Sequence, residues 1–345
     1  MFFRRGIALA LATFSILTVL VAIFGTVPVA KFPLSFFNTG PVSSLTGAEG
    51  SDGPVLVVKI DDTTLAHPQV GLKSADVVYI EQVEGGLTRL AAVFSSKIPA
   101  LIGPVRSARI SDIELLSQYG KVGFSYSGAQ RLLLPVIATA DLYDLGANKF
   151  GPKFYANDPA RIAPYAMMVK AQELLVEAQQ RGIAPVTSKN MGWNFDGPSS
   201  EPIAIKGAHI SWPASSYDAI WSESEDRWLL NHNGEVNLDS DGYILGPKTF
   251  VIQMVSITDS IFKDKVGGVT PFSATVGTGK CYLLRNGGYI PCNWSRPNEQ
   301  SGTTFTDLNG NEATFEPGQI WFALTSKEPD FSLKTVRDAT TTTRK

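Results

Sequence analysis

The chain has 345 residues, of which 44% are hydrophobic and 18% are charged, and its formal net charge at pH 7 is −2. This composition is typical of a folded protein, and the length is enough for two domains of about 100 to 200 residues each. A net charge close to zero provides no basic field that would attract a polyanion. The composition therefore excludes general nucleic-acid binding, and we expect no nucleic-acid partner.

The N-terminal segment predicts a membrane protein. Arg4 and Arg5 precede an uncharged run, residues 6–30, which as a helix would be about 37 Å long and would span a bilayer. The run exceeds the apolar core of a signal peptide, and Pro28 stands where a cleavage site needs a small residue. We therefore predict that residues 1–30 are an uncleaved single-pass anchor in the cell membrane, with a cleaved signal peptide as the alternative. The positive charges place the N-terminus in the cytoplasm and the globular part on the extracytoplasmic side.

Composition divides the rest of the chain into five parts. Residues 31–53 are rich in Gly, Ser and Pro and are expected to form a flexible tether. Residues 54–187 show the pattern of a mixed α/β domain, and residues 203–325 that of a β-rich, mainly antiparallel domain. The Gly, Pro, Ser and Asn of residues 188–202 indicate a boundary loop, and residues 326–345 read as a disordered tail. The fold class is α+β.

Short apolar runs predict the strands of the first domain at 55–60, 77–80, 90–94 and 122–126. Ser111 and Glu114 match a capping box that would start a helix. Further helices are expected at 130–138 and from Pro164 onward, where apolar residues recur at helical spacing. Strands of the second domain are expected at 203–212, 219–221, 227–230, 250–257, 274–276 and 320–324.

The two cysteines are predicted to form a disulfide. If Asn286 and Gly287 form a two-residue hairpin turn, counting outward along both strands brings Cys281 opposite Cys292. Directly opposed residues are close enough for a bridge, and an exported domain meets an oxidising environment.

The three histidines, His67, His209 and His232, show no metal-ligand spacing in the sequence. We interpret them as isolated surface or core residues, and we expect no metal and no cofactor.

The densest polar constellation lies in residues 81–89 and 102–112. It combines arginines with carboxylates and a glycine pair, which suits an anion-binding cleft near the start of a helix. The predicted ligand-binding residues are Arg89, Arg106, Arg109, Gly85, Gly86 and Ser107. The carboxylates Glu81, Glu84 and Asp61 are candidates for acid/base catalysis. Two alternatives remain open: a structural ion network of the same charges, and a simple turn at the glycines.

From about residue 54 to residue 325 the chain resembles the YerB-like family of bacterial envelope proteins, whose function is uncharacterised. The resemblance rests on Ile60-Asp61 and on the motifs at 68–76, 84–89 and 102–109. Members are usually lipoproteins or membrane-anchored proteins. The resemblance implies an α+β N-terminal domain and a β-rich C-terminal domain.

The chain also departs from the family pattern. Where the family has His-Asn after a proline, this chain has Tyr165 and Ala166 after Pro164, and Thr249 replaces a usual asparagine. An arginine that is usual near residues 229–231 is also missing. These losses favour a non-catalytic binding or accessory module that recognises an anionic cell-wall component or another envelope protein. The alternative is an enzyme acting on phosphorylated or glycan envelope substrates.

Overall fold

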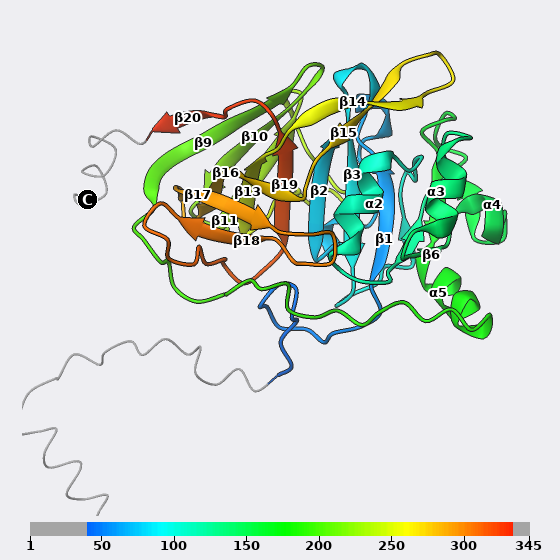
Figure 1. Cartoon of the computed structure of the whole chain (residues 1–345), viewed down its shortest axis with the longest axis horizontal. Coiled ribbons are helices and arrows are strands. Elements are labelled where there is room, and N and C mark those ends of the chain that lie inside the picture. Colours follow the sequence, from blue (N-terminus) through cyan, green and yellow to red (C-terminus); the bar gives the residue numbers. More distant parts are fainter. Residues whose placement is uncertain (1–39, 334–345) are drawn as a thin grey trace, which may run out of the picture. The chain divides into compact units, whose positions relative to one another are not determined.

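The computed structural model describes residues 40–333, which are dominated by strands (Figure 1). The strands of the first half are β1 (Leu56–Asp61), β2 (Val77–Gln82), β3 (Thr88–Phe94), β4 (Leu101–Ile102), β5 (Gly123–Ser125), β6 (Tyr143–Asp144), β7 (Tyr155–Asn157) and β8 (Met167–Lys170). Those of the second half are β9 (Ile203–Trp212), β10 (Ser215–Ser222), β11 (Arg227–His232), β12 (Glu235–Val236), β13 (Thr249–Met254), β14 (Ile257–Lys263), β15 (Val269–Ser273), β16 (Gly277–Arg285), β17 (Gly288–Arg296), β18 (Thr304–Asp307), β19 (Ile320–Thr325) and β20 (Asp330–Leu333). The helices are α2 (Ile110–Ser117), α3 (Leu133–Thr139), α4 (Ala147–Phe150) and α5 (Ala171–Gln180), and the 3-10 turns are η2 (Thr64–Ala66), η3 (Leu72–Ser74) and η4 (Glu84–Gly86).

One mixed sheet contains most of the strands, in the order β12-β11-β10-β9-β17-β16-β13-β19-β2-β3-β1-β5-β6. Strand β18 pairs with β17 and β20 pairs with β9, while β14-β15 and β4-β8-β7 form two small sheets. The predicted membrane anchor, residues 1–30, lies outside the described residues. Among the helices of residues 40–333, none is both long and apolar enough to cross a membrane.

Strands β1, β2 and β3 are buried on both faces. Val57 and Val58 are neighbours in β1 and point to opposite faces, yet both are fully buried, each in a different apolar cluster. An unbroken apolar run is typical of a strand that is covered on both sides. The strands predicted at 55–60, 77–80 and 90–94 are confirmed.

Strand β19 connects the two halves of the chain. It runs parallel to β13 on one side and to β2 on the other, so that Ile320 lies opposite both Thr249 and Val77. Figure 1 shows β19 beside β2 near the middle of the strands. The described residues from Pro41 onward belong to one compact unit. The structure therefore has a large mixed sheet with mainly antiparallel strands in its C-terminal part, and the domain boundary at 188–202 stays a prediction.

The capping box predicted at Ser111 and Glu114 is wrong. The N-cap of helix α2 is Arg109, two residues before Ser111, and Oδ2 of Asp112 accepts the backbone N–H of Arg109 at 2.6 Å. A carboxylate in the first turn satisfies an amide that has no partner within the helix. Asp112 therefore caps this helix.

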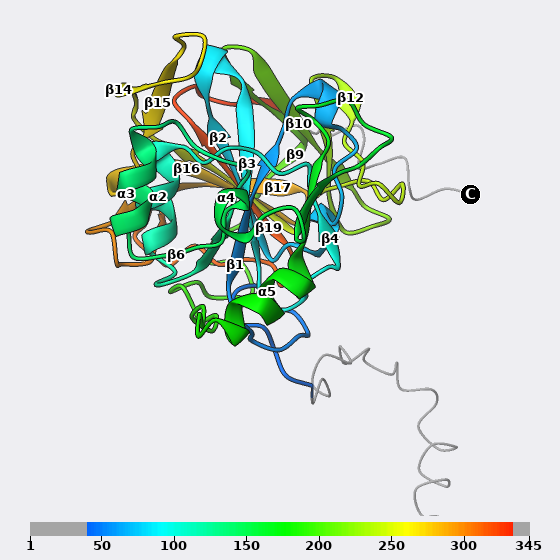
Figure 2. The same ribbon diagram turned by 90° about the vertical axis from the view of Figure 1, so that its right-hand side faces the viewer.

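The side chains of Ser111 and Glu114 attach α2 to the C-terminal half instead. Oγ of Ser111 accepts the backbone N–H of Ser273 at 2.9 Å, and Oε1 of Glu114 accepts that of Thr275 at 2.6 Å. Figure 2 shows the β14-β15 hairpin beside α2. Sequence spacing alone could not distinguish these long-range partners from a local cap.

The helix predicted from Pro164 begins later. Residues 167–170 form β8, which pairs with β7 and β4, and α5 follows from Ala171 to Gln180. Gly182, with a φ of 75°, follows the end of the helix. The strand predicted at 274–276 is also wrong, because these residues connect β15 to β16.

Two segments that were predicted to be flexible or disordered are partly packed. The tether prediction fails from residue 40 onward, since Leu45 is fully buried and the hydroxyl of Ser188 donates to Asp52 at 2.8 Å. The tail prediction fails for residues 326–333, because β20 pairs with β9. The remaining parts of both predictions lie outside the described residues.

The predicted disulfide is confirmed. Asn286 and Gly287 have φ values of 49° and 70° and form the two-residue turn between β16 and β17. Counting outward from this turn pairs Cys281 with Cys292, whose Cα atoms are 4.7 Å apart and whose sulfur atoms are bonded. Both cysteines are buried.

We predict that replacing Cys281 and Cys292 together with alanine lowers the free energy of unfolding by about 2–3 kcal/mol. A bridge across a short loop restricts the unfolded chain by about this amount. Urea unfolding measures the change, and thiol labelling of the unfolded, unreduced wild type should detect no free thiol. Two reactive thiols per chain in the exported protein would contradict the prediction.

Candidate functional site

Two polar clusters lie at the end of β1, on opposite faces of the sheet. Asp61 is the last residue of β1, and it lies in register with Arg89 of β3, which in turn lies opposite Glu81 of β2. Residues in register across a sheet share a face, whereas the next residue, Asp62, points to the other face. We call the first group, which comprises Asp61, Glu84, Arg89, Arg106 and Arg109, the arginine cluster. The second group, which comprises Asp62, His67 and His232, is the histidine cluster.

Two of the three arginines in the arginine cluster are paired with a carboxylate. Nε of Arg106 lies 2.6 Å from Oδ2 of Asp61, which is fully buried. Nε of Arg109 lies 2.7 Å from Oε1 of Glu84, and its Nη2 donates to Oε2 at 2.8 Å. Burial alone would raise the pKa of Glu84, but Arg109 and the hydroxyl of Thr270 lower it below its ordinary value. Glu84 is therefore held as a carboxylate.

Arg89 is the third arginine, and its environment differs. Its Nη1 donates to the backbone carbonyl of Ser107 at 2.9 Å, and the same carbonyl accepts Nη1 of Arg109 at 3.4 Å. Among residues 40–333, no carboxylate oxygen lies within 4.0 Å of the Arg89 guanidinium. Burial, followed by the positive charges of Arg109 and Arg106, lowers the pKa of Arg89 to about 9. The side chain remains partly exposed.

Glu81 belongs to a separate buried triad. Nζ of Lys59 lies 2.8 Å from Oε1 of Glu81 and 2.7 Å from Oδ1 of Asp112, and all three side chains are buried. One lysine therefore faces two carboxylates. Burial and the neighbouring carboxylate of Asp112 raise the pKa of Glu81 to about 8. The sequence analysis did not identify Lys59, although a lysine inside an apolar strand is a recognisable sign of a buried ion pair.

The glycine pair forms a turn. Gly85 and Gly86 lie in η4 with φ values of 69° and 73°. A Cβ atom at Gly86 would lie only 2.4 Å from Cβ of Pro213, so this glycine lets the turn pack against the loop between β9 and β10. The surroundings of Gly85 are open, with no atom within 4 Å of such a Cβ.

The structure thus brings together most of the predicted site. Arg89, Arg106 and Arg109 meet around the backbone of Ser107, with Asp61 and Glu84 as counter-ions. Glu81 is bonded to Lys59 instead. The catalytic and ligand-binding roles of these residues stay predictions.

Of the residues that depart from the family pattern, Tyr165 lies at the arginine cluster and Thr249 does not. The ring of Tyr165 lies under the guanidinium of Arg106, 5.5 Å from Cζ to the ring centroid, and Ala166 is buried behind it. Thr249 lies elsewhere, where its hydroxyl accepts the backbone N–H of Glu316 at 2.8 Å.

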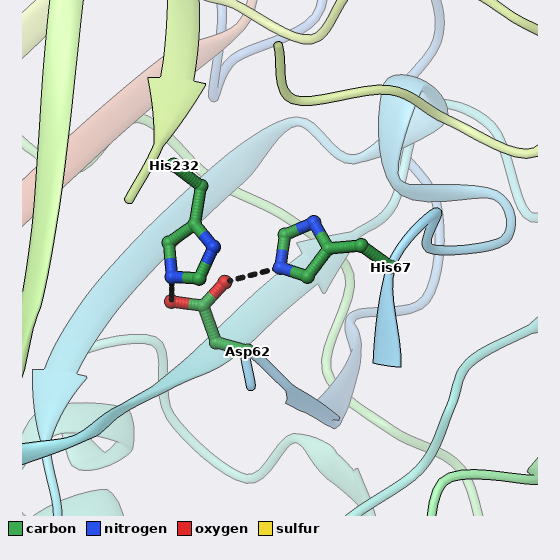
Figure 3. A group of neighbouring side chains, drawn as sticks. All are labelled: Asp62, His67 and His232. Atoms are coloured by element: carbon green, nitrogen blue, oxygen red, sulfur yellow. Dashed lines mark ion pairs between the residues drawn. The ribbon is translucent and has the colours of Figure 1, made fainter. Parts of the chain in front are cut away.

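The interpretation of His67 and His232 as isolated residues is wrong. Their rings stack with centroids 4.5 Å apart and 7° between the planes (Figure 3). Nε2 of His67 lies 3.4 Å from Oδ1 of Asp62, and Nε2 of His232 lies 3.8 Å from Oδ2. His209 is separate and pairs with Asp218 at 2.7 Å. The histidine cluster joins residues far apart in the chain, so no local spacing could have revealed it.

Asp62 is the buried centre of the histidine cluster. The hydroxyls of Thr88 and Tyr217 each donate to its carboxylate at 2.6 Å. Burial raises the pKa of Asp62, but the imidazoles of His232 and His67 and the Thr88 hydroxyl outweigh this effect and lower it below its ordinary value. Burial lowers the pKa of His232.

The sequence of this chain matches a protein family whose function is described as unknown. The chain matches the family models "Protein of unknown function (DUF3048) N-terminal domain" over residues 42–184 and "Protein of unknown function (DUF3048) C-terminal domain" over residues 208–322. Together these matches cover well over half of the chain, and the chain therefore belongs to this family.

A sequence relative and a structural relative of this chain are the same protein, YerB of Bacillus subtilis. The chain is 48% identical over 279 residues to "Putative lipoprotein YerB" of Bacillus subtilis, a match that covers 78% of this chain and 80% of the relative. The crystal structure of the YerB protein from Bacillus subtilis matches with a TM-score of 0.71 over 84% of this chain and 99% of that chain. The structural alignment pairs residues with 19% identity and shows a shared fold. The resemblance to the YerB-like family is confirmed.

We predict that Glu81→Gln flattens the pH dependence of stability. The folded-state pKa of Glu81, about 8, lies above its ordinary value of 4.5, so the folded state binds the extra proton between these values. The contribution of Glu81 to the free energy of unfolding is therefore fully present below pH 4.5. It is lost as the pH rises from 4.5 toward about 8, by at most about 1.4 kcal/mol per pH unit. Urea unfolding of wild type and variant across this window measures the difference.

The exposed Glu201 provides the matched control for this experiment. The free energy of unfolding of Glu201→Gln should depend on pH in the same way as that of the wild type. Parallel profiles for the wild type and Glu81→Gln would contradict the raised pKa of the triad.

Proposed function

We propose that this chain is an extracytoplasmic, envelope-associated module that binds an anionic group at the arginine cluster. The observation that carries the proposal is a charge imbalance in which three guanidinium groups face two carboxylates. Arg106 and Arg109 have carboxylate partners, whereas within residues 40–333 Arg89 has only the carbonyl of Ser107 at hydrogen-bonding distance. One positive charge is left for a ligand.

Electrostatics favour an anion beside Arg89. Burial, followed by the neighbouring charges of Arg109 and Arg106, disfavours the protonated form of Arg89 and lowers its pKa. A phosphate or carboxylate group would relieve this repulsion and would accept the guanidinium N–H groups that do not reach Ser107. Since Arg89 is partly exposed, such a group could approach from solvent.

Tyr165 supports the same reading. Its ring centroid lies 5.5 Å from Cζ of Arg106, whose side chain is 21% exposed. Stacking on an aromatic ring orients a guanidinium without using its N–H donors. The ring that replaces the family's usual His-Asn therefore positions a second arginine at the cluster.

The cell envelope is the proposed location. The relative YerB carries the word lipoprotein in its name, and the N-terminal Arg4 and Arg5 with the uncharged residues 6–30 support membrane attachment of this chain. A single N-terminal helix would serve as the anchor. The anionic group would then belong to a cell-wall component or to another envelope protein.

The geometry favours binding over catalysis. Glu81 is fully buried against Lys59, and Glu84 and Asp61 are each paired with an arginine. A general acid or base needs hydrogen-bond reach to a substrate proton, which a carboxylate buried in an ion pair lacks in this arrangement. The arginine cluster is therefore proposed as a binding site.

We predict that Arg89→Ala weakens the binding of inorganic phosphate or soluble cell-wall fragments about tenfold or more and leaves unfolding cooperative. A hydrogen bond to a charged group contributes about 1.5–3 kcal/mol, and Arg89 leaves no protein carboxylate unpaired when it is removed. Thermal unfolding with and without the anion, followed by titration calorimetry, measures both quantities.

Arg109→Ala and Arg131→Ala provide the comparisons. Arg109→Ala should lower stability by about 3–5 kcal/mol, because it leaves the buried Glu84 without its cation. Arg131 is exposed, and Arg131→Ala should change neither stability nor binding. If no anion raises the melting temperature of the wild type, the arginine cluster is a structural ion network and the proposed function is wrong.

We further predict that residues 40–333 are outside the cell and remain attached to it. Protease added to intact cells stripped of their wall should degrade this part of the chain, as it degrades a known exported protein. A cytoplasmic protein serves as the control for cell integrity. Survival of the C-terminal strands under these conditions would refute the extracytoplasmic location.

A further inference from the structure

Asp62 is a fully buried carboxylate that lacks a permanent cation. Among residues 40–333, neither a lysine nor an arginine forms an ion pair with it, and its nearest basic groups are the imidazoles of His67 and His232. Each carboxylate oxygen accepts one hydroxyl hydrogen bond: Oδ2 from Thr88 and Oδ1 from Tyr217. Buried carboxylates in proteins are either paired with a cation or bound to a metal ion, so the remaining positions call for a positive charge.

The hydrogen bonds of His67 direct a lone pair toward Asp62. Its Nδ1 lies 3.1 Å from Oδ1 of Asn237, and an oxygen acceptor at this position favours the proton on Nδ1. Nε2 then carries the lone pair, and the amide nitrogen of Gln69 at 3.1 Å is a suitable donor to it. This lone pair faces a carboxylate oxygen 3.4 Å away, which is an arrangement of two acceptors. A cation between them would turn this repulsion into attraction.

Gln69 adds a further polar group to the same space. The residue is fully buried, and its Oε1 has no hydrogen-bond partner. Its amide nitrogen lies 3.5 Å from Oδ1 of Asp62 as well as 3.1 Å from Nε2 of His67. If the amide turns by half a rotation, the unpartnered oxygen takes this place and becomes a fourth donor atom.

We propose that Asp62, His67 and His232 bind a divalent transition-metal ion of the Zn²⁺ type, with the amide of Gln69 or a water molecule completing the site. Two imidazoles and one carboxylate are a donor set that suits Zn²⁺. Donor atoms around tetrahedral Zn²⁺ lie about 3.3 Å apart. Nε2 of His67 lies 3.4 Å from Oδ1 of Asp62, and Nε2 of His232 lies 3.8 Å from Oδ2. One donor atom from each of the three residues lies within 4.8 Å of the other two, so a small movement would bring them to this spacing.

Binding requires one ring to turn. The two imidazoles are nearly parallel, and an ion cannot lie in the plane of both rings at once (Figure 3). His232 is buried with a side-chain exposure of 4%, whereas His67 has 16% and follows the short turn η2. His67 is therefore the ligand that moves and the route by which the ion enters.

The groups around the donor atoms fit a metal site. Asn237 fixes the tautomer of His67, while Thr88 and Tyr217 orient the carboxylate of Asp62. Such outer hydrogen bonds are typical of metal ligands and support their orientation. Asp62 and His67 come from the first half of the chain and His232 from the second, so the ion would join the two halves. The site is on the opposite face of the sheet from the arginine cluster and does not depend on the proposed anion binding.

The test is metal binding to the full chain, purified in mild detergent and treated with a chelator. We expect Zn²⁺ to bind with one ion per chain in titration calorimetry and to raise the melting temperature. Co²⁺ as a substitute should give the visible absorption of a tetrahedral site. His67→Ala, which removes the partly exposed ligand, should weaken Zn²⁺ binding about tenfold or more.

His209→Ala is the matched control, because His209 pairs with Asp218 outside the cluster, and this variant should bind Zn²⁺ like the wild type. Circular dichroism of both variants without metal establishes that they are folded. Absence of one-to-one binding in the wild type, or equal binding by His67→Ala, would overturn the proposal. Stability that responds to acidification but not to Zn²⁺ would also overturn it, since a protonated imidazole would then supply the cation. None of these outcomes depends on phosphate binding at Arg89.

Discussion

The burial of β1, β2 and β3 on both faces is the constraint on which the polar chemistry of this protein depends. With apolar clusters on either side of the sheet, every charged side chain that these strands carry must find a partner within the protein. Lys59 and Glu81 meet this requirement inside the sheet, and Asp61 meets it with Arg106 at the end of β1. Asp62, the next residue, has two imidazoles as its nearest basic groups. Because these two aspartates point to opposite faces, a single strand end produces two independent polar clusters.

The two clusters differ in how completely their charges are balanced. In the arginine cluster three arginines face two carboxylates at a partly exposed position, whereas the buried carboxylate of the histidine cluster has two imidazoles as its nearest basic groups. An unpaired arginine near the surface favours binding of a soluble anion, whereas an unpaired carboxylate in the interior favours binding of a small cation. Under the two proposals made above, the same strand end serves recognition on one face and stabilisation on the other.

Much of this architecture could be predicted from the sequence, because short-range rules controlled it. The central strands were visible as apolar runs, and the disulfide followed from the turn at Asn286 and Gly287. The motifs also predicted which arginines would gather. The predictions failed where a distant segment competes with a local rule: Ser111 and Glu114 bond to residues more than 150 positions away, and His67 meets His232 only through the folded sheet. Local spacing contains no information about such partners.

The position of β19 has a consequence for the way the protein reaches its folded state. Strand β2 borders β3 on one side, and in the described part of the chain its other edge pairs with residues 320–323 of β19. During synthesis or export, the N-terminal strands would therefore emerge with one edge of β2 unpaired. More than two hundred further residues must follow before β19, which pairs with this edge, is available. Open edges of this kind invite pairing with other chains, and long-range parallel pairing is slow. If the chain is exported, as proposed, it would need to be held unfolded, or protected, until β19 has been translocated.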